Sequence, residues 1–83
     1  MPIVAQIGPR LSPLRAARAV AVAEHMRQKG GSVYLSDLYA PMRFKGMSKA
    51  QTDRAVDDLA ESGRAAIFTT TYGGLAVRLR GAA

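Results

Sequence analysis

The sequence predicts an α+β domain, mainly helical, in which three helices accompany a small antiparallel sheet that ends in a β-hairpin. Two observations carry this prediction. Residues 48–63 form a helix that marks both of its own ends, and after Gly63 the hydrophobic pattern changes from the helical period to the alternation of strands. With 83 residues, the chain is long enough for one domain with a single small core. We expect an N-terminal arm over residues 1–11, a folded domain over 12–80 and a tail over 81–83.

The charge of the chain is positive and unevenly spread. The net charge is +6, made up of +5 from residues 1–47, −2 from residues 48–63 and +3 from residues 64–83. A positive excess on so small a domain attracts polyanions, of which nucleic acid is the commonest. The basic residues therefore flank the helix at 48–63 rather than cover it.

Several classes of function find no support in the composition. The chain has no Cys and a single His, so we expect no disulfide and no transition-metal site. No spacing places a base beside a nucleophile, and Gly73-Gly74 lacks the Lys-Ser/Thr of a phosphate loop. No apolar run is long enough to cross a membrane. We expect a soluble, cytoplasmic, non-enzymatic protein with no cofactor, no metal and no evident small-molecule effector.

The first helix is expected to begin at Ser12-Pro13, where a capping residue precedes proline at the first helical position. It should run to about Lys29, because Gly30-Gly31 ends it. Its sequence offers two apolar faces. The main one, expected to face the core, is Ala16, Ala19, Val20, Val22, Ala23 and Met26, and the second is Leu14, Ala17 and Ala21.

A short strand is expected at residues 33–35, followed by a second helix capped by Ser36-Asp37. Pro41 interrupts this helix because proline lacks the N–H and clashes with the preceding turn. The second helix therefore either ends near Ala40 or continues in distorted form to Phe44.

The third helix begins with a capping box, in which Ser48 caps the backbone N–H of Gln51 and Gln51 reaches back to Ser48. Gly63 ends it by entering the left-handed region. The buried face should consist of Thr52, Ala55, Val56 and Leu59, and the outward face of Ala50, Asp53, Arg54, Asp57 and Glu61.

Residues 65–71 and 75–80 form the hairpin around a turn at Tyr72-Gly73-Gly74. Leu75, Val77 and Leu79 should point to one side of the sheet, with Ala76, Arg78 and Arg80 on the other. The predicted core is Val22, Met26, Leu38, Val56, Leu59, Ile67, Val77 and Leu79.

One stretch carries a family resemblance over residues 13–80. Leu38 is followed by Ser48-x-x-Gln51-x-x-Arg54-x-Val56-x-x-Leu59-x-x-x-Gly63-x-Ala65 and then by the hairpin. This order resembles the winged helix-turn-helix superfamily, as in bacterial regulators of the MarR and ArsR type. The chain departs from that pattern at Pro41 and in the acidic second half of the third helix.

The resemblance implies that the third helix enters the DNA major groove with its first turns. The contacting residues would be Ser48, Lys49, Gln51 and Arg54. Arg can bind guanine and Gln can bind adenine bidentately. The alternative for Arg54 is a pair with Asp57 or Asp58 on the helix surface.

Two further groups would contact the DNA backbone or the minor groove. Arg43 and Lys45 flank the turn before the third helix, and a solvated loop is the alternative for them. The hairpin would act as the wing through Thr71, Tyr72, Arg78 and Arg80, because hydroxyls and Arg are common phosphate ligands. The alternative is a solubilising hairpin whose basic face is solvated.

The function that we expect is sequence-preferring binding of double-stranded DNA, as a small transcriptional regulator. Two alternatives stay open: a winged helix that binds a partner protein through its acidic helix, and an architectural DNA binder without sequence preference. We also expect a homodimer through Leu14, Ala17 and Ala21, joined by the arm residues Ile3, Val4 and Ile7. Otherwise the arm folds back over that face of its own chain.

Overall fold

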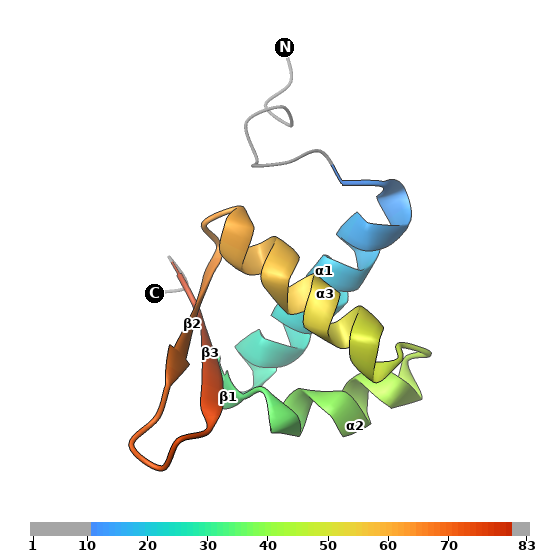
Figure 1. The fold of residues 1–83 in the computed structure, drawn as a ribbon. Coiled ribbons are helices and arrows are strands. Elements are labelled where there is room, and N and C mark those ends of the chain that lie inside the picture. The colour runs from blue at the N-terminus through green and yellow to red at the C-terminus, as the bar shows by residue number, and fades with distance from the viewer. Residues whose placement is uncertain (1–10, 81–83) are drawn as a thin grey trace.

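A computed structural model describes residues 11–80, which form three helices on one side of a three-stranded sheet (Figure 1). The expected arm, apart from Leu11, and the tail lie outside the described residues. The elements in chain order are α1 (Pro13–Gln28), β1 (Ser32–Tyr34), α2 (Ser36–Phe44), α3 (Lys49–Glu61), β2 (Ala65–Thr69) and β3 (Leu75–Leu79). This is the predicted fold class, with a winged-helix-like order of elements.

The sheet is antiparallel, with β3 in the centre and the order β1-β3-β2. In one row of neighbours across the sheet, Val77 lies between Val33 and Ile67, and this row faces the helices. In the next row, Ala76 lies between Tyr34 and Phe68, on the face turned away from the helices. Adjacent strands bring such side chains within about 5 Å of one another.

The predicted alternation along β3 is correct for most of the strand. Val77, Leu79 and Arg78 lie as expected, but Leu75 at the strand's start is exposed. Ala76 lies on the other side of the sheet from Val77, as predicted, but it is buried. It is small, and the two aromatic side chains beside it in the register cover it.

Helix α1 starts as predicted, since the backbone N–H of Arg15 donates to the Ser12 hydroxyl at 3.2 Å. The buried residues of this helix, Ala19, Val22, Ala23 and Met26, all belong to the predicted core face, and two residues differ from the prediction. Val20, expected in the core, is 56% exposed, whereas Ala21, expected on the second face, packs against the core. Alanine occurs on every side of this helix, so the hydrophobic pattern distinguishes its buried face from its exposed face only weakly.

Helix α2 follows the longer alternative and reaches Phe44 with Pro41 inside it. The expected cap at Ser36-Asp37 is wrong, because the N-cap position is Leu35 and no side chain caps the helix. The backbone N–H of Leu35 still donates to Leu75 at 2.9 Å, as a continuation of the sheet pairing. The chain therefore passes from strand to helix without the extended residue that a capping side chain requires.

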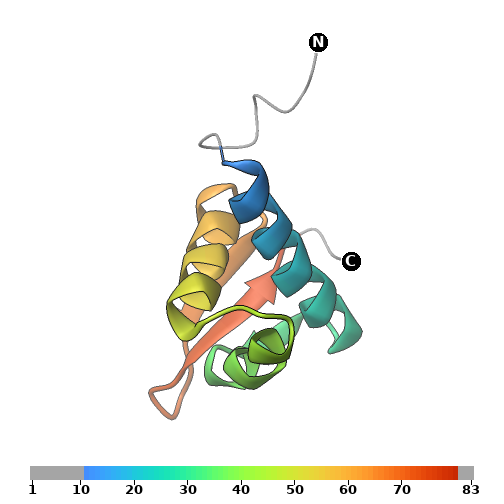
Figure 2. The same cartoon turned by 90° about the vertical axis from the view of Figure 1, so that its right-hand side faces the viewer.

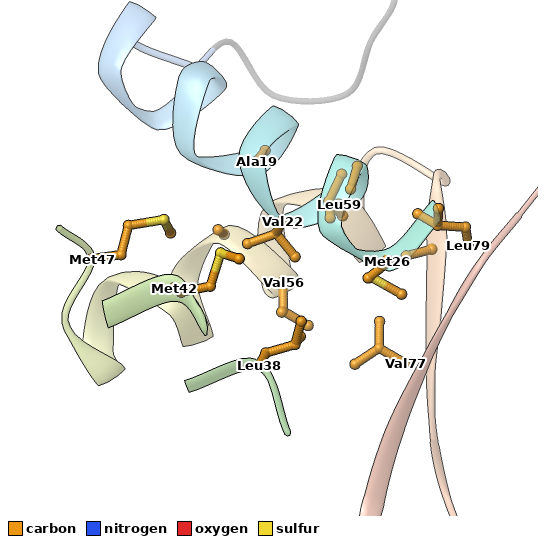
Figure 3. Close-up of a cluster of buried hydrophobic side chains, with 13 residues drawn as sticks. Ala19, Val22, Met26, Leu38, Met42, Met47, Val56, Leu59, Val77 and Leu79 are labelled. Carbon is orange, nitrogen blue, oxygen red and sulfur yellow. The ribbon is translucent and has the colours of Figure 1, made fainter. Parts of the chain in front are cut away.

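The core lies between the three helices and the inner face of the sheet (Figure 3). Seven of the eight predicted core residues are buried, and the exception is Ile67, which is 38% exposed. Ile67 faces the helix side but lies on the edge strand β2, where the helices cover it incompletely. The prediction also missed Met42 and Met47, which fill the space between α1, α2 and α3 (Figure 3).

Candidate nucleic-acid interface

The N-terminal end of α3 has the predicted capping box. The Ser48 hydroxyl accepts from the backbone N–H of Gln51 at 3.1 Å, and the Gln51 side-chain oxygen accepts from the backbone N–H of Ser48 at 3.0 Å. Both groups therefore already have partners within the helix start. A bidentate contact from Gln51 to adenine would have to share the same amide oxygen, which can accept two hydrogen bonds, with the capping box.

Four cationic side chains surround this helix start, and all four are exposed. They lie at the end of α2, in the turn, and in the first half of α3, and are Arg43, Lys45, Lys49 and Arg54. Among residues 11–80, none of them takes part in an ion pair within 4.0 Å. In particular, Arg54 forms no such pair with Asp57 or Asp58, the alternative that the sequence left open. These side chains are available to an anion.

A small cluster joins α2 to the start of α3. The Tyr39 hydroxyl donates to Asp53 Oδ1 at 2.6 Å, and the Lys49 ammonium lies 5.1 Å from the centre of the Tyr39 ring. Burial, the hydrogen bond and the charge of Asp53 raise the pKa of Tyr39 to about 12. The cluster links α2 to the first half of α3. Sequence reasoning missed it, because Tyr39 and Asp53 lie on different helices and no local spacing relates them.

The C-terminal half of α3 is held differently, by an ion pair to α1. Arg15 Nη2 lies 2.6 Å from Asp58 Oδ1, and Arg15 Nε donates to Asp58 Oδ2 at 3.2 Å. The Asp58 side chain is only 1% exposed, whereas that of Arg15 is 37% exposed. The hydrogen bond to Asp58 raises the pKa of Arg15 above its ordinary value. Arg15 on α1 thus neutralises a buried carboxylate on α3.

The hairpin turn exposes Tyr72, with 92% of its surface accessible, beside the exposed Thr71. Gly73 has a φ of +85°, and its N–H donates to the Thr70 carbonyl at 2.9 Å, which closes the turn. In Figure 2 the turn and α3 both lie on the left of the molecule, and α1 lies on the right. The turn and the outward face of α3 therefore belong to the same side.

Arg78 and Arg80, expected in the wing with Tyr72, lie elsewhere. Arg78 is opposite Ser32 and Ala66 on the face of the sheet turned away from the helices. The backbone N–H of Arg80 donates to the Arg64 carbonyl at 2.8 Å, at the end of the hairpin remote from the turn. At about 3.3 Å per residue, Arg80 is roughly 16 Å along the strand from Leu75. The residues predicted to contact DNA thus separate into two groups, one at the start of α3 and the hairpin turn and the other on the sheet.

The predicted dimer face of α1 is only partly available. Leu14 is 60% exposed and Ala17 is exposed, but Ala21 belongs to the core side. Val20, which the prediction had placed in the core, lies on the exposed face in place of Ala21.

Within residues 11–80, no three His, Cys, Asp or Glu side chains lie close enough together to hold a metal ion. In the same part of the chain, no helix has the length and apolar character needed to cross a membrane. No protein-family model matches the sequence, and no curated protein matches it with significant similarity.

Proposed function

We propose that the protein binds double-stranded DNA with sequence preference, as a small non-enzymatic transcriptional regulator. One observation carries the proposal: the exposed start of α3 lies among four cations that no described carboxylate neutralises. Backbone N–H groups at a helix start favour phosphate, and the cations add to that attraction. The turn residues Thr71 and Tyr72 lie on the same side of the molecule and would contact the adjacent backbone.

Only the first half of α3 suits insertion into the groove. Its second half exposes Asp57 and Glu61, which repel phosphates. Arg54 is therefore the side chain that we assign to base readout, and Arg43, Lys45 and Lys49 contact phosphates. Ser48 and Gln51 contribute chiefly by holding the helix start in shape, through the capping box.

A titration against random duplex DNA at 50 and 200 mM salt tests this function. Three to four phosphate contacts give a slope of about −3 in log K against log salt, or a loss of roughly 40- to 150-fold in affinity. Duplex binding that is absent at 50 mM salt, or unchanged by salt, would contradict the proposal.

Selection of bound sequences from the same random pool, followed by Arg54→Ala, tests the preference itself. Loss of a bidentate guanine contact removes about 1–3 kcal/mol of discrimination. Lys45→Ala is the matched control, because a phosphate contact weakens binding to all sequences equally. If wild type selects no sequence, the protein is an architectural binder instead.

The homodimer remains part of the proposal, with Leu14, Ala17 and Val20 as the face on α1. Two related half-sites would extend the few base pairs that one helix reads. Sedimentation equilibrium at micromolar concentration should give a dimer mass that Val20→Glu reduces to a monomer. A monomer mass in the wild type excludes this interface. Ala21→Glu is unsuitable for the test, because Ala21 packs against the core.

A further inference from the structure

The face of the sheet turned away from the helices has its own composition. We call it the outer sheet face and define it by Tyr34, Ala66, Phe68, Ala76, Arg78 and Arg80. In Figure 1 all three helices lie on the opposite side of the sheet, so no described element covers this face. Tyr34 and Phe68 lie on either side of Ala76 and are 45% and 38% exposed. Two partly exposed aromatic side chains thus lie on either side of the buried Ala76.

The charge on this face is entirely positive. None of the three strands contains an acidic residue. Arg80 is beside Arg64 across the hairpin, and among residues 11–80 neither they nor Arg78 form an ion pair within 4.0 Å. Like charges on neighbouring strands repel each other, so an anion bound here would relieve that repulsion.

The arginines and the rings are close enough to act together. The Arg78 guanidinium lies 5.7 Å from the centre of the Phe68 ring, and Arg78 and Arg80 line one shallow depression with Phe68 and Ala66. A planar guanidinium over a ring offers a further flat surface on which a base can stack. The site therefore presents a stacking surface and a phosphate ligand side by side.

We propose that the outer sheet face binds single-stranded nucleic acid, with bases stacked on Phe68 and Tyr34 and phosphates held by Arg78 and Arg80. Exposed rings can stack only on bases that are free of a duplex, because paired bases are already stacked on one another. The face is also narrow: Tyr34 and Phe68 are two strand spacings apart, about 10 Å. That width suits one strand better than a duplex. This surface is separate from the start of α3, so the proposal does not depend on duplex binding.

The test is a fluorescence-anisotropy titration of the full 83-residue chain with a fluorescein-labelled oligomer of twenty thymidines, at 50 and 200 mM salt. The variant is Tyr34→Leu with Phe68→Leu, which retains apolar bulk over Ala76 and removes both rings. Its affinity should fall by at least about fivefold, since 1 kcal/mol or more is lost per stacked base. Arg78→Gln should make the salt slope shallower by about 0.7. Phe44→Leu is the matched control, because Phe44 is 93% exposed but lies at the end of α2.

Circular dichroism and thermal unfolding establish whether each variant is folded. If the double variant is not folded, the single variant Phe68→Leu replaces it. Absence of binding at 50 mM salt overturns the proposal. So does unchanged affinity in the ring variants. If Arg54→Ala loses as much affinity for the oligomer as the ring variants do, the single-stranded DNA binds at the start of α3, and the proposal is likewise overturned. If the ring variants instead lower the sedimentation mass and leave oligomer binding unchanged, the face is an interface between copies. Binding of the oligomer without duplex binding would leave this proposal standing and remove the one above.

Discussion

The two ends of α3 differ in charge, in exposure and in what holds them. The N-terminal end is fixed by contacts within its own first turn and by Tyr39, and its cations face solvent. The C-terminal end is anchored to α1 through the buried Asp58, and its remaining acids are exposed. The outward face of α3 thus changes along the helix: its first half carries exposed cations, and its second half carries exposed acids and the buried Asp58. Changes at one end should leave the other largely unaffected.

The largest effect is expected from Arg15→Met, which leaves the Asp58 carboxylate buried without a partner. Removing one member of a buried pair is strongly destabilising, and the loss is smaller here than for a fully buried pair because the Arg15 side chain is 37% exposed. Urea denaturation measures the change in the free energy of unfolding.

Two controls show whether the ion pair is responsible. Arg18→Met alters the same helix at a residue with no ion pair to the described chain, and should change stability by less than about 0.5 kcal/mol. Arg15→Met combined with Asp58→Leu replaces the pair by apolar groups and should regain most of the loss. An equal loss of stability in Arg15→Met and Arg18→Met would show that the ion pair between Arg15 and Asp58 contributes little to the stability of the fold.

At the other end, Ser48→Ala removes the hydroxyl that caps α3 and should cost about 1 kcal/mol. Ser36→Ala is the matched control. Both serines lie at a helix start, but no side chain caps α2. Ser36→Ala should therefore be nearly neutral, and denaturant midpoints for the pair give the comparison. Similar losses of stability in the two variants would contradict the claim that a side chain caps α3 and none caps α2.

An effect of similar size concerns Tyr39 and pH. Its pKa is about 12 in the folded chain, against about 10 when unfolded. Below pH 10 the hydroxyl is neutral in both states and its contribution is complete. Between pH 10 and 12 the unfolded chain releases this proton more readily, so stability falls as pH rises.

Tyr39→Phe should cost about 1 kcal/mol at pH 7 through the lost hydrogen bond to Asp53. The stability of the variant should also fall less steeply between pH 10 and 12 than that of the wild type. Parallel pH profiles for the two proteins would show that Tyr39 does not link α2 to α3 in this way.

Much of this fold could be predicted from sequence because its signals are local. The capping box, Gly63 with its φ of +78° and the alternation after it each lie within a few residues, and the structure confirms them. The places of Val20 and Ala21 on α1 were predicted wrongly, because alanine on several sides of the helix gives little hydrophobic contrast at the edge of its core face.

The candidate site was less accessible to sequence reasoning, because its parts meet only through tertiary packing. Forty-three residues separate Arg15 from Asp58, and fourteen separate Tyr39 from Asp53. Alternation correctly placed Arg78 on the polar face of β3. It could not tell that this face is turned away from the helices and carries Tyr34 and Phe68.

The most direct test of the division within α3 is to map duplex contacts by backbone amide chemical shifts in the ¹⁵N-labelled protein. A selected duplex should shift amides at residues 43–54 and 70–74, and leave those of residues 57–61 nearly unchanged. Shifts concentrated at residues 57–61, or on the strands that carry Tyr34 and Phe68, would contradict the account that the start of α3 reads DNA.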